Sequence, residues 1–169
     1  TDLILYRFCK FFLGTFSGVA EIPILFGRPA VHLLPFYPII EHNLFRHKED
    51  ICIFNRIYSR DKGRELTISE TFDVAIEFRV KYICRGEYFS EHGLELIPFS
   101  QDDIRDVAKE MNEKLDGIWT DESEDDELRR ILNLKIKAVM DKNHRALGEV
   151  YPMAVATSFL RKYKYLLED

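Results

Sequence analysis

The 169-residue sequence predicts an α/β protein, with a short parallel β-sheet flanked by helices and a helical C-terminal third. Between Phe11 and Leu34, an apolar strand, a loop of small residues, a helix and a second apolar strand follow one another. From Ser100 onward, apolar residues recur at helical spacing. The composition is 46% apolar and 31% charged, which suits one domain (residues 1–169) whose helical portion is residues 100–169.

The first third of the chain predicts two strands joined through a helix. Residues 2–10 have helical spacing and lead into a buried strand at residues 11–13. A turn of small residues follows, then helical character over residues 19–26 and a second buried strand at residues 30–34. Strands joined in this way run parallel with a right-handed connection, so the loop after Leu13 should open at the carboxyl edge of the sheet. Ligands of open α/β sheets bind at that edge.

The remainder is predicted to be irregular at first and then helical. Aromatic and basic residues without clear periodicity indicate loops and short elements between residues 36 and 69. We expect the later elements to be a helix at 68–79, a short strand at 93–98 and helices at 100–115, 126–142 and 153–167. The helix after Ser100 should bury one face, made of Ile104, Val107, Ala108, Met111 and Leu115.

Charge and cysteine content exclude several classes of protein. The net charge of −5 argues against a nonspecific nucleic-acid binder, so no nucleic-acid partner is expected. The three cysteines form no CxxC pattern, which favours reduced thiols in the cytoplasm. Charges and prolines interrupt the apolar stretches, so we expect no transmembrane segment and no signal peptide, while peripheral membrane association stays open. The chain opens inside an apolar periodic segment at Thr1, which suggests a fragment of a larger protein.

The segment FFLGTFSG, residues 11–18, carries the clearest chemical signal. A strand that ends in glycine and hydroxyl residues before a helix exposes backbone amides, and Thr15 and Ser17 can add hydroxyl donors. This arrangement suits a diphosphate, although a tight turn with a serine N-cap explains the same residues. Neither GxGxxG nor GxxxxGKS occurs here, so Rossmann dinucleotide and P-loop sites are not predicted.

A longer stretch, RFCKFFLGTFSGVAEIPILFGRPAVHLLP, resembles the donor-side signature of bacterial GT-B-like glycosyltransferases encoded in surface-polysaccharide gene clusters. That signature is an apolar strand, Gly-Thr-x-Ser-Gly, a helix with a proline, Phe-Gly-x-Pro and another apolar strand. The similarity continues in the family's order through GRELTISE, GLELIPFSQDDIRDVAKEM and SFLRKYKYLL.

The resemblance implies the Rossmann-like, C-terminal half of a GT-B glycosyltransferase, which binds a nucleotide-diphosphate sugar as donor. Gly14, Thr15, Ser17 and Gly18 would then face the diphosphate. The absent N-terminal domain would bring the glycan acceptor and the general base, so the fragment alone should not turn over substrate. Such enzymes need neither a bound metal nor a tightly bound cofactor, because helix N-termini and basic side chains neutralise the leaving diphosphate. Three basic side chains could help to neutralise the leaving diphosphate: Arg56, Arg60 and Arg64. The alternative interpretation is that they belong to a solvated basic loop.

Other polar residues also have two interpretations. Glu21 could reach a sugar hydroxyl or support the first turn of its helix. Glu70 could hold a ribose hydroxyl or form a T-x-x-E capping box with Thr67, and the capping box is favoured. His32 is predicted to be a buried, hydrogen-bonded strand residue, and the acidic block at residues 121–127 to be the solvated start of a helix.

A second function from another class is compatible with the same sequence. The α/β unit would be a noncatalytic scaffold, and the C-terminal helices would bind a protein partner. This hypothesis predicts an exposed apolar stripe on the helix at residues 100–115 or on the last helix.

Overall fold

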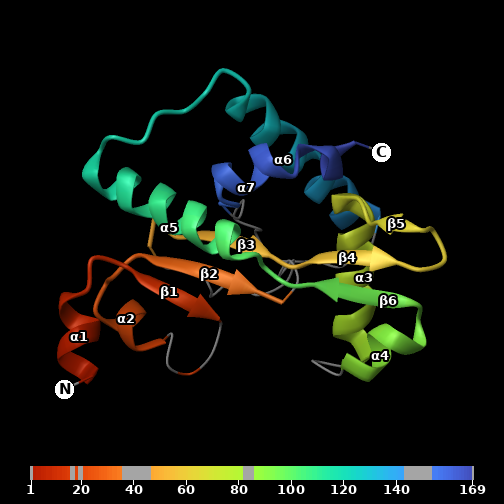
Figure 1. The fold of residues 1–169 in the computed structure, drawn as a ribbon, viewed down its shortest axis with the longest axis horizontal. Coiled ribbons are helices and arrows are strands. Elements are labelled where there is room, and N and C mark those ends of the chain that lie inside the picture. The colour runs from red at the N-terminus through yellow and green to blue at the C-terminus, as the bar shows by residue number, and fades with distance from the viewer. Residues whose placement is uncertain are drawn as a thin grey trace.

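A computed structural model describes residues 2–15, 18, 21–35, 47–81, 86–142 and 154–168. The described residues form two three-stranded sheets that follow each other along the chain (Figure 1). The first sheet contains β1 (Phe12–Thr15), β2 (Ala30–Leu34) and β3 (Ile51–Phe54), all parallel and in that spatial order. The α/β class and the short parallel sheet are therefore confirmed.

The parallel sheet is buried unevenly across its three strands. Every residue of β2 and β3 is buried, as expected of continuous apolar runs covered on both faces. β1 is only half-buried because it pairs with β2 alone among the described strands. Beyond β3, Val155 forms a parallel bridge with Cys52 and extends the pairing by one residue.

The second sheet is antiparallel. It contains β4 (Arg56–Ser59), β5 (Arg64–Glu65) and β6 (Leu94–Ile97), with β4 in the centre. Its small core consists of Ile57, Leu66, Phe89 and Leu94. Helices α3 (Ile68–Lys81) and α4 (Gly86–Glu91) belong to this half of the structure (Figure 1).

Helices cover both faces of the parallel sheet. α1 (Asp2–Phe8) and α2 (Glu21–Leu25) lie on one side, whereas α5 (Gln101–Asp116), α6 (Asp125–Lys142) and α7 (Thr157–Lys162) lie on the other (Figure 1). The predicted buried face of α5 is confirmed at its centre, where Val107 and Met111 are fully buried. None of the helices in the described parts of the chain combines the length and apolar character needed to cross a membrane.

Local capping signals define the ends of α5. Ser100 and Asp103 form a reciprocal capping box, with Ser100 N–H donating to Asp103 Oδ2 at 2.8 Å and Asp103 N–H donating to Ser100 Oγ at 3.1 Å. Gly117 ends the helix at φ 70°, a left-handed conformation that glycine adopts without a steric penalty.

A buried carboxylate joins α5 to α7. Glu110 is fully buried, and it accepts hydrogen bonds from the backbone N–H groups of Thr157 at 2.9 Å and Ser158 at 2.8 Å. The Lys114 ammonium donates to the same carboxylate at 2.6 Å. Glu110 therefore caps the first turn of α7 from a neighbouring helix, although α7 has no side-chain cap of its own.

The structure specifies one expectation and corrects others. The short elements expected between residues 36 and 69 include three strands, β3, β4 and β5. The expected helix at residues 153–167 starts only at Thr157, because Val155 pairs with the sheet, and it ends at Lys162 before a 3₁₀ turn at Lys164–Leu167.

The acidic block is also not a purely solvated helix start. Asp125 is fully buried, and its carboxylate accepts hydrogen bonds from Arg161 Nε at 2.8 Å and Arg161 Nη2 at 2.5 Å. The paired hydrogen bonds attach the start of α6 to α7.

Candidate functional site

The predicted ligand loop begins at the carboxyl edge of the parallel sheet. Strands β1, β2 and β3 end at Thr15, Leu34 and Phe54, and these ends lie at the same edge because the strands are parallel and in register. Thr15 and Gly18 are exposed, and α2 starts at Glu21. Ser17 lies outside the described residues. The loop therefore leaves the sheet at the edge where the sequence predicts a ligand.

Gly14 has a packing role within β1. A Cβ atom built on Gly14 would lie 2.7 Å from Cζ of Phe12, so the aromatic ring covers this face of the strand. The glycine is needed for this close approach. A ligand that contacts the loop would therefore approach Thr15 and the residues after it, because the Phe12 ring occupies this face of Gly14.

Each of the three arginines proposed to neutralise the diphosphate forms an ion pair with a glutamate. Arg60 Nε lies 2.8 Å from Glu95 Oε1, on an exposed part of the second sheet. Arg64 Nη1 lies 2.8 Å from Glu70 Oε2. Both arginines lie near the far end of β4, about 10 Å from its first residue, Arg56, at the usual strand rise. The structure therefore brings Arg64 and Glu70 together, but it does not bring Arg60 or Arg64 to the loop after β1.

Arg56 is the arginine nearest to the carboxyl edge along the chain, since only Asn55 separates it from β3. Its Nη1 atom lies 2.6 Å from Glu65 Oε1, and its guanidinium carbon lies 4.3 Å from the centroid of the Tyr163 ring. Burial lowers the pKa of Arg56, but hydrogen bonding and charge attraction from Glu65 outweigh it and raise the pKa. Arg56 is therefore a fixed cation with an existing counterion.

Glu70 forms the predicted capping box. Thr67 N–H donates to Glu70 Oε2 at 2.8 Å, and Glu70 N–H donates to Thr67 Oγ1 at 3.4 Å. Lys62 and Arg64 also donate to this carboxylate. The hydrogen bond from Arg64, with those from Lys62 and Thr67, lowers the pKa of Glu70 to about 2 despite partial burial. A ribose hydroxyl would have to compete with these donors for the carboxylate.

His32 and Glu21 have different environments. His32 is fully buried at the centre of β2, and its Nε2 atom lies 3.9 Å from Asp50 Oδ2. Asp50 also accepts hydrogen bonds from Ala30 N–H at 2.7 Å and His47 N–H at 3.0 Å. The prediction that His32 is buried is confirmed. Glu21 is half-buried at the first position of α2, directly after the loop.

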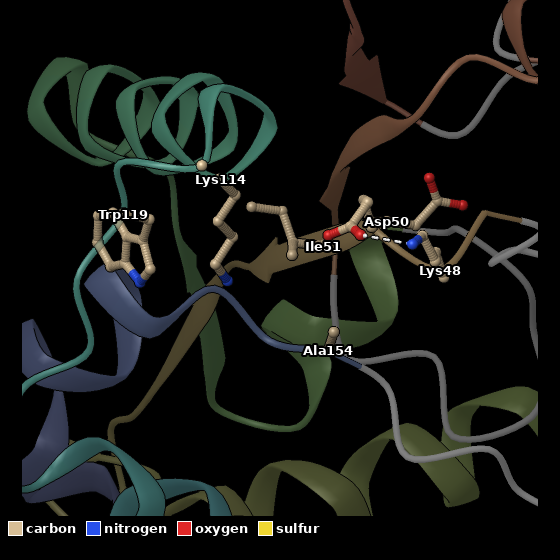
Figure 2. A pocket seen from close by; sticks show the side chains of 8 residues that line it. Lys48, Asp50, Ile51, Lys114, Trp119 and Ala154 are labelled. Atoms are coloured by element: carbon tan, nitrogen blue, oxygen red, sulfur yellow. Dashed lines mark ion pairs between the residues drawn. The ribbon is translucent and has the colours of Figure 1, made fainter.

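The structure reveals a second concave site that the sequence did not indicate. A pocket of about 290 Å³ lies at the amino edge of the parallel sheet, next to the start of β3 (Figure 2). It is lined by Lys48, Glu49, Asp50, Ile51, Lys114, Gly117, Trp119 and Ala154. Figure 2 shows Lys114 and Trp119 on one side and Lys48 on the other. The pocket and the loop after β1 are therefore at opposite edges of the same sheet.

Both lysines of the pocket already have acidic neighbours. Lys48 Nζ lies 3.6 Å from Glu49 Oε1, and Lys114 Nζ lies 2.6 Å from Glu110 Oε1. Trp119 lies near two cations, with its ring centroid 5.7 Å from Lys114 Nζ and 5.1 Å from the guanidinium carbon of Arg161. The sequence offered one signal for this pocket: Trp119 is the single tryptophan of the chain, and it comes shortly after the glycine that ends α5.

Metal ligands are not concentrated at either site. Within the described ranges, no group of three or more His, Cys, Asp or Glu residues is placed to hold a metal ion. The fold and the two sites thus define a mixed α/β protein with a short parallel sheet. No family model, no curated protein and no solved structure matches the chain.

Proposed function

We propose that this chain is the donor-binding part of a glycosyltransferase that acts in bacterial surface glycan synthesis. The loop between β1 and α2 would bind the diphosphate of a nucleotide sugar. One observation carries this proposal: the loop leaves the carboxyl edge of a parallel sheet, and its described residues Thr15 and Gly18 are exposed. The resemblance of residues 7–35 to the donor-side signature of such enzymes supports the same assignment.

Hydrogen bonding in the loop would provide most of the affinity. α2 has only five residues, so its dipole contributes little to holding an anion. The donors would be the hydroxyl groups of Thr15 and Ser17 and the amide of Gly18. Arg56 would contribute positive charge near the carboxyl edge, although its pairing with Glu65 reduces the net field.

Calorimetric titration of the 169-residue chain with UDP, GDP and ADP tests the proposal. We expect saturable binding of at least one nucleotide. Ser17→Ala should weaken that binding by about 10- to 150-fold, because a hydrogen bond to a charged group is worth ~1.5–3 kcal/mol. Thr15→Val, which keeps the side-chain shape, should have a smaller effect in the same direction.

Two further variants make the result specific to the loop. A Cβ atom at Gly18 would have no heavy atom within 4 Å, so Gly18→Ala should fold normally and report on close approach of the ligand. Ser90→Ala, an equivalent change at an exposed position of α4, should leave binding unchanged. Absence of binding by all three nucleotides, or equal weakening by Ser90→Ala, would reject the donor-site assignment.

The noncatalytic alternative finds less support in its predicted surface. The apolar residues Val107 and Met111 of α5 face the core, as do Phe159 and Leu160 of α7. The apolar stripe that this hypothesis requires on those helices is therefore buried within the chain. We retain donor binding as the proposed function.

A further inference from the structure

Exposed apolar side chains are concentrated on α1 and at the end of α2. Among the described residues, nine large hydrophobic side chains are exposed, and six of them belong to these two neighbouring segments. Leu3, Ile4, Leu5 and Phe8 expose between 61% and 72% of their surface. Leu25 exposes 74% and Phe26 exposes 40%. We call these six residues the α1–α2 patch.

α1 is attached to the rest of the chain along a narrow side. Tyr6 contacts Phe12 of β1 with ring centroids 6.4 Å apart, and Tyr6 and Cys9 are half-buried. The exposed apolar residues, together with the exposed Arg7, therefore occupy the remaining helix surface. A helix that is apolar on several sides is normally covered by other protein or by lipid. The arrangement indicates that α1 is covered when the protein is in its working state.

One edge of β1 pairs with no strand among the described residues, and this open edge lies beside the patch (Figure 1). Phe12 N–H donates to Pro29 O at 2.9 Å, on the side of β2. Since backbone groups alternate in direction along a strand, the N–H and C=O groups of Leu13 and Thr15 face the open side. β1 has the sequence FLGT, without the lysine, proline or charged residue that commonly protects an edge strand.

The size of the patch is close to what one partner contributes to a stable interface. The six exposed fractions together equal nearly four fully exposed side chains. At ~150 Å² for each side chain, covering the patch would bury about 600 Å² on this chain. Pairing at the open edge of β1 would add to this area. A standard interface buries about 800 Å² on each partner.

We propose that the α1–α2 patch and the open edge of β1 form a self-association surface occupied by a second copy of this chain. A two-fold axis perpendicular to the sheet would pair β1 antiparallel with β1 of the second copy. The same axis would place both α1 helices side by side on one face of the joined sheet. The six patch residues are apolar, with the guanidinium carbon of Arg7 5.7 Å from the Phe8 ring centroid, and such an apolar patch can match its own copy, as an isologous interface requires. The inference goes beyond the proposed function, because it depends on neither the loop nor a nucleotide.

Sedimentation velocity of the whole chain over a range of concentrations tests this surface. We expect a reversible dimer below about 100 µM, since interfaces of this size give dissociation constants in the micromolar range or tighter. Leu5→Glu combined with Phe8→Glu should weaken the dimer by at least about 100-fold, since each change places a charge in the apolar contact. Both side chains are exposed in the monomer, so circular dichroism should show an unchanged fold.

Leu134→Glu is the matched control, because Leu134 is 52% exposed but lies on α6, away from the patch. This variant should dimerise like the unmodified chain. Hydrogen exchange adds a readout of the strand contact: protection of the Leu13 and Thr15 amides should increase with protein concentration.

Three results would overturn the proposal. The first is a chain that remains monomeric at the highest concentration. The second is a dimer that survives the Leu5→Glu and Phe8→Glu changes. The third is a monomer that binds phospholipid vesicles through the patch, which would assign the surface to lipid. Nucleotide titration of the Leu5→Glu, Phe8→Glu variant separates this test from that of the proposed function, because the donor loop is unchanged.

Discussion

Replacing Glu110 tests how far one buried carboxylate holds α7 in place. Glu110→Ala removes the acceptor for the amides of Thr157 and Ser158 and leaves the Lys114 ammonium without its counterion. Removing one partner of a buried ion pair costs about 3–5 kcal/mol, and the two amides of the first turn of α7 lose their side-chain cap as well. We therefore expect the free energy of unfolding to fall by at least about 3 kcal/mol.

Glu110→Gln separates charge from shape. Its single amide oxygen can accept from Thr157 or Ser158, whereas its NH₂ group would face the other amide donor. We expect a loss of about 2–3 kcal/mol, because one buried N–H becomes unsatisfied and one charge-assisted hydrogen bond disappears. Urea denaturation followed by circular dichroism and by Trp119 fluorescence measures both losses.

Glu113 supplies the control on the same helix. Its carboxylate lies 3.7 Å from Lys109 Nζ in a surface i,i+4 pair, so Glu113→Gln should change stability by less than about 0.5 kcal/mol. If Glu110→Gln and Glu113→Gln had equal effects, the buried carboxylate would not be the connection between α5 and α7.

Three further predictions concern pH, packing and capping. The hydrogen bond from Arg161 lowers the folded-state pKa of Asp125 below its unfolded value of about 3.9. The ionised carboxylate of Asp125 therefore stabilises the fold fully above a pH of about 3.9, and this stabilisation is lost as the pH falls through the folded-state pKa. Acid denaturation should therefore be shallower in Asp125→Asn, and parallel acid titrations of both proteins would contradict this. Gly14→Ala should destabilise by about 1–3 kcal/mol through overpacking against Phe12, and Phe12→Leu should relieve part of that loss in a double-mutant cycle measured by thermal unfolding. Glu70→Gln should cost about 1 kcal/mol because the capping box and its ion pairs weaken, and an unchanged urea midpoint would refute this role.

Elements with local signals could be predicted from the sequence. The second strand was predicted with the bounds that the structure has, because Pro29 and Pro35 flank a continuous apolar run. The starts of α3 and α5 were also predicted, since each capping box connects residues only three positions apart. Short-range hydrogen bonds of this kind are visible in a single sequence.

Elements that depend on distant partners could not be specified from the sequence. β3 is a four-residue apolar run inside a polar and aromatic stretch, and it is a strand because it pairs with β2 and with Val155. Val155 itself was expected in a helix. Its bridge partner, Cys52, lies about a hundred positions away in the sequence. Tertiary pairing of this kind overrides local propensity.

The candidate sites also divide into features with local sequence signals and features that depend on distant contacts. The position of the loop after β1 at the carboxyl edge follows from the strand, helix and strand order, so the sequence could predict it. The ion pairs of Arg56, Arg60 and Arg64 depend on the register of β4 with β5 and β6 and on the packing of α3, which no local pattern specifies. The pocket beside Trp119 requires the end of α5 to meet the start of β3.

The attachment of α7 has a consequence for how the protein is made. Asp103, Glu110 and Asp125 are buried, and each bonds to groups in residues 157–163, which lie 36 to 60 positions further along the sequence. Until those residues emerge, the three carboxylates lack those donors, and β3 lacks its contact with Val155. A nascent chain therefore cannot complete this core until residues 157–163 have been synthesised and have left the ribosome.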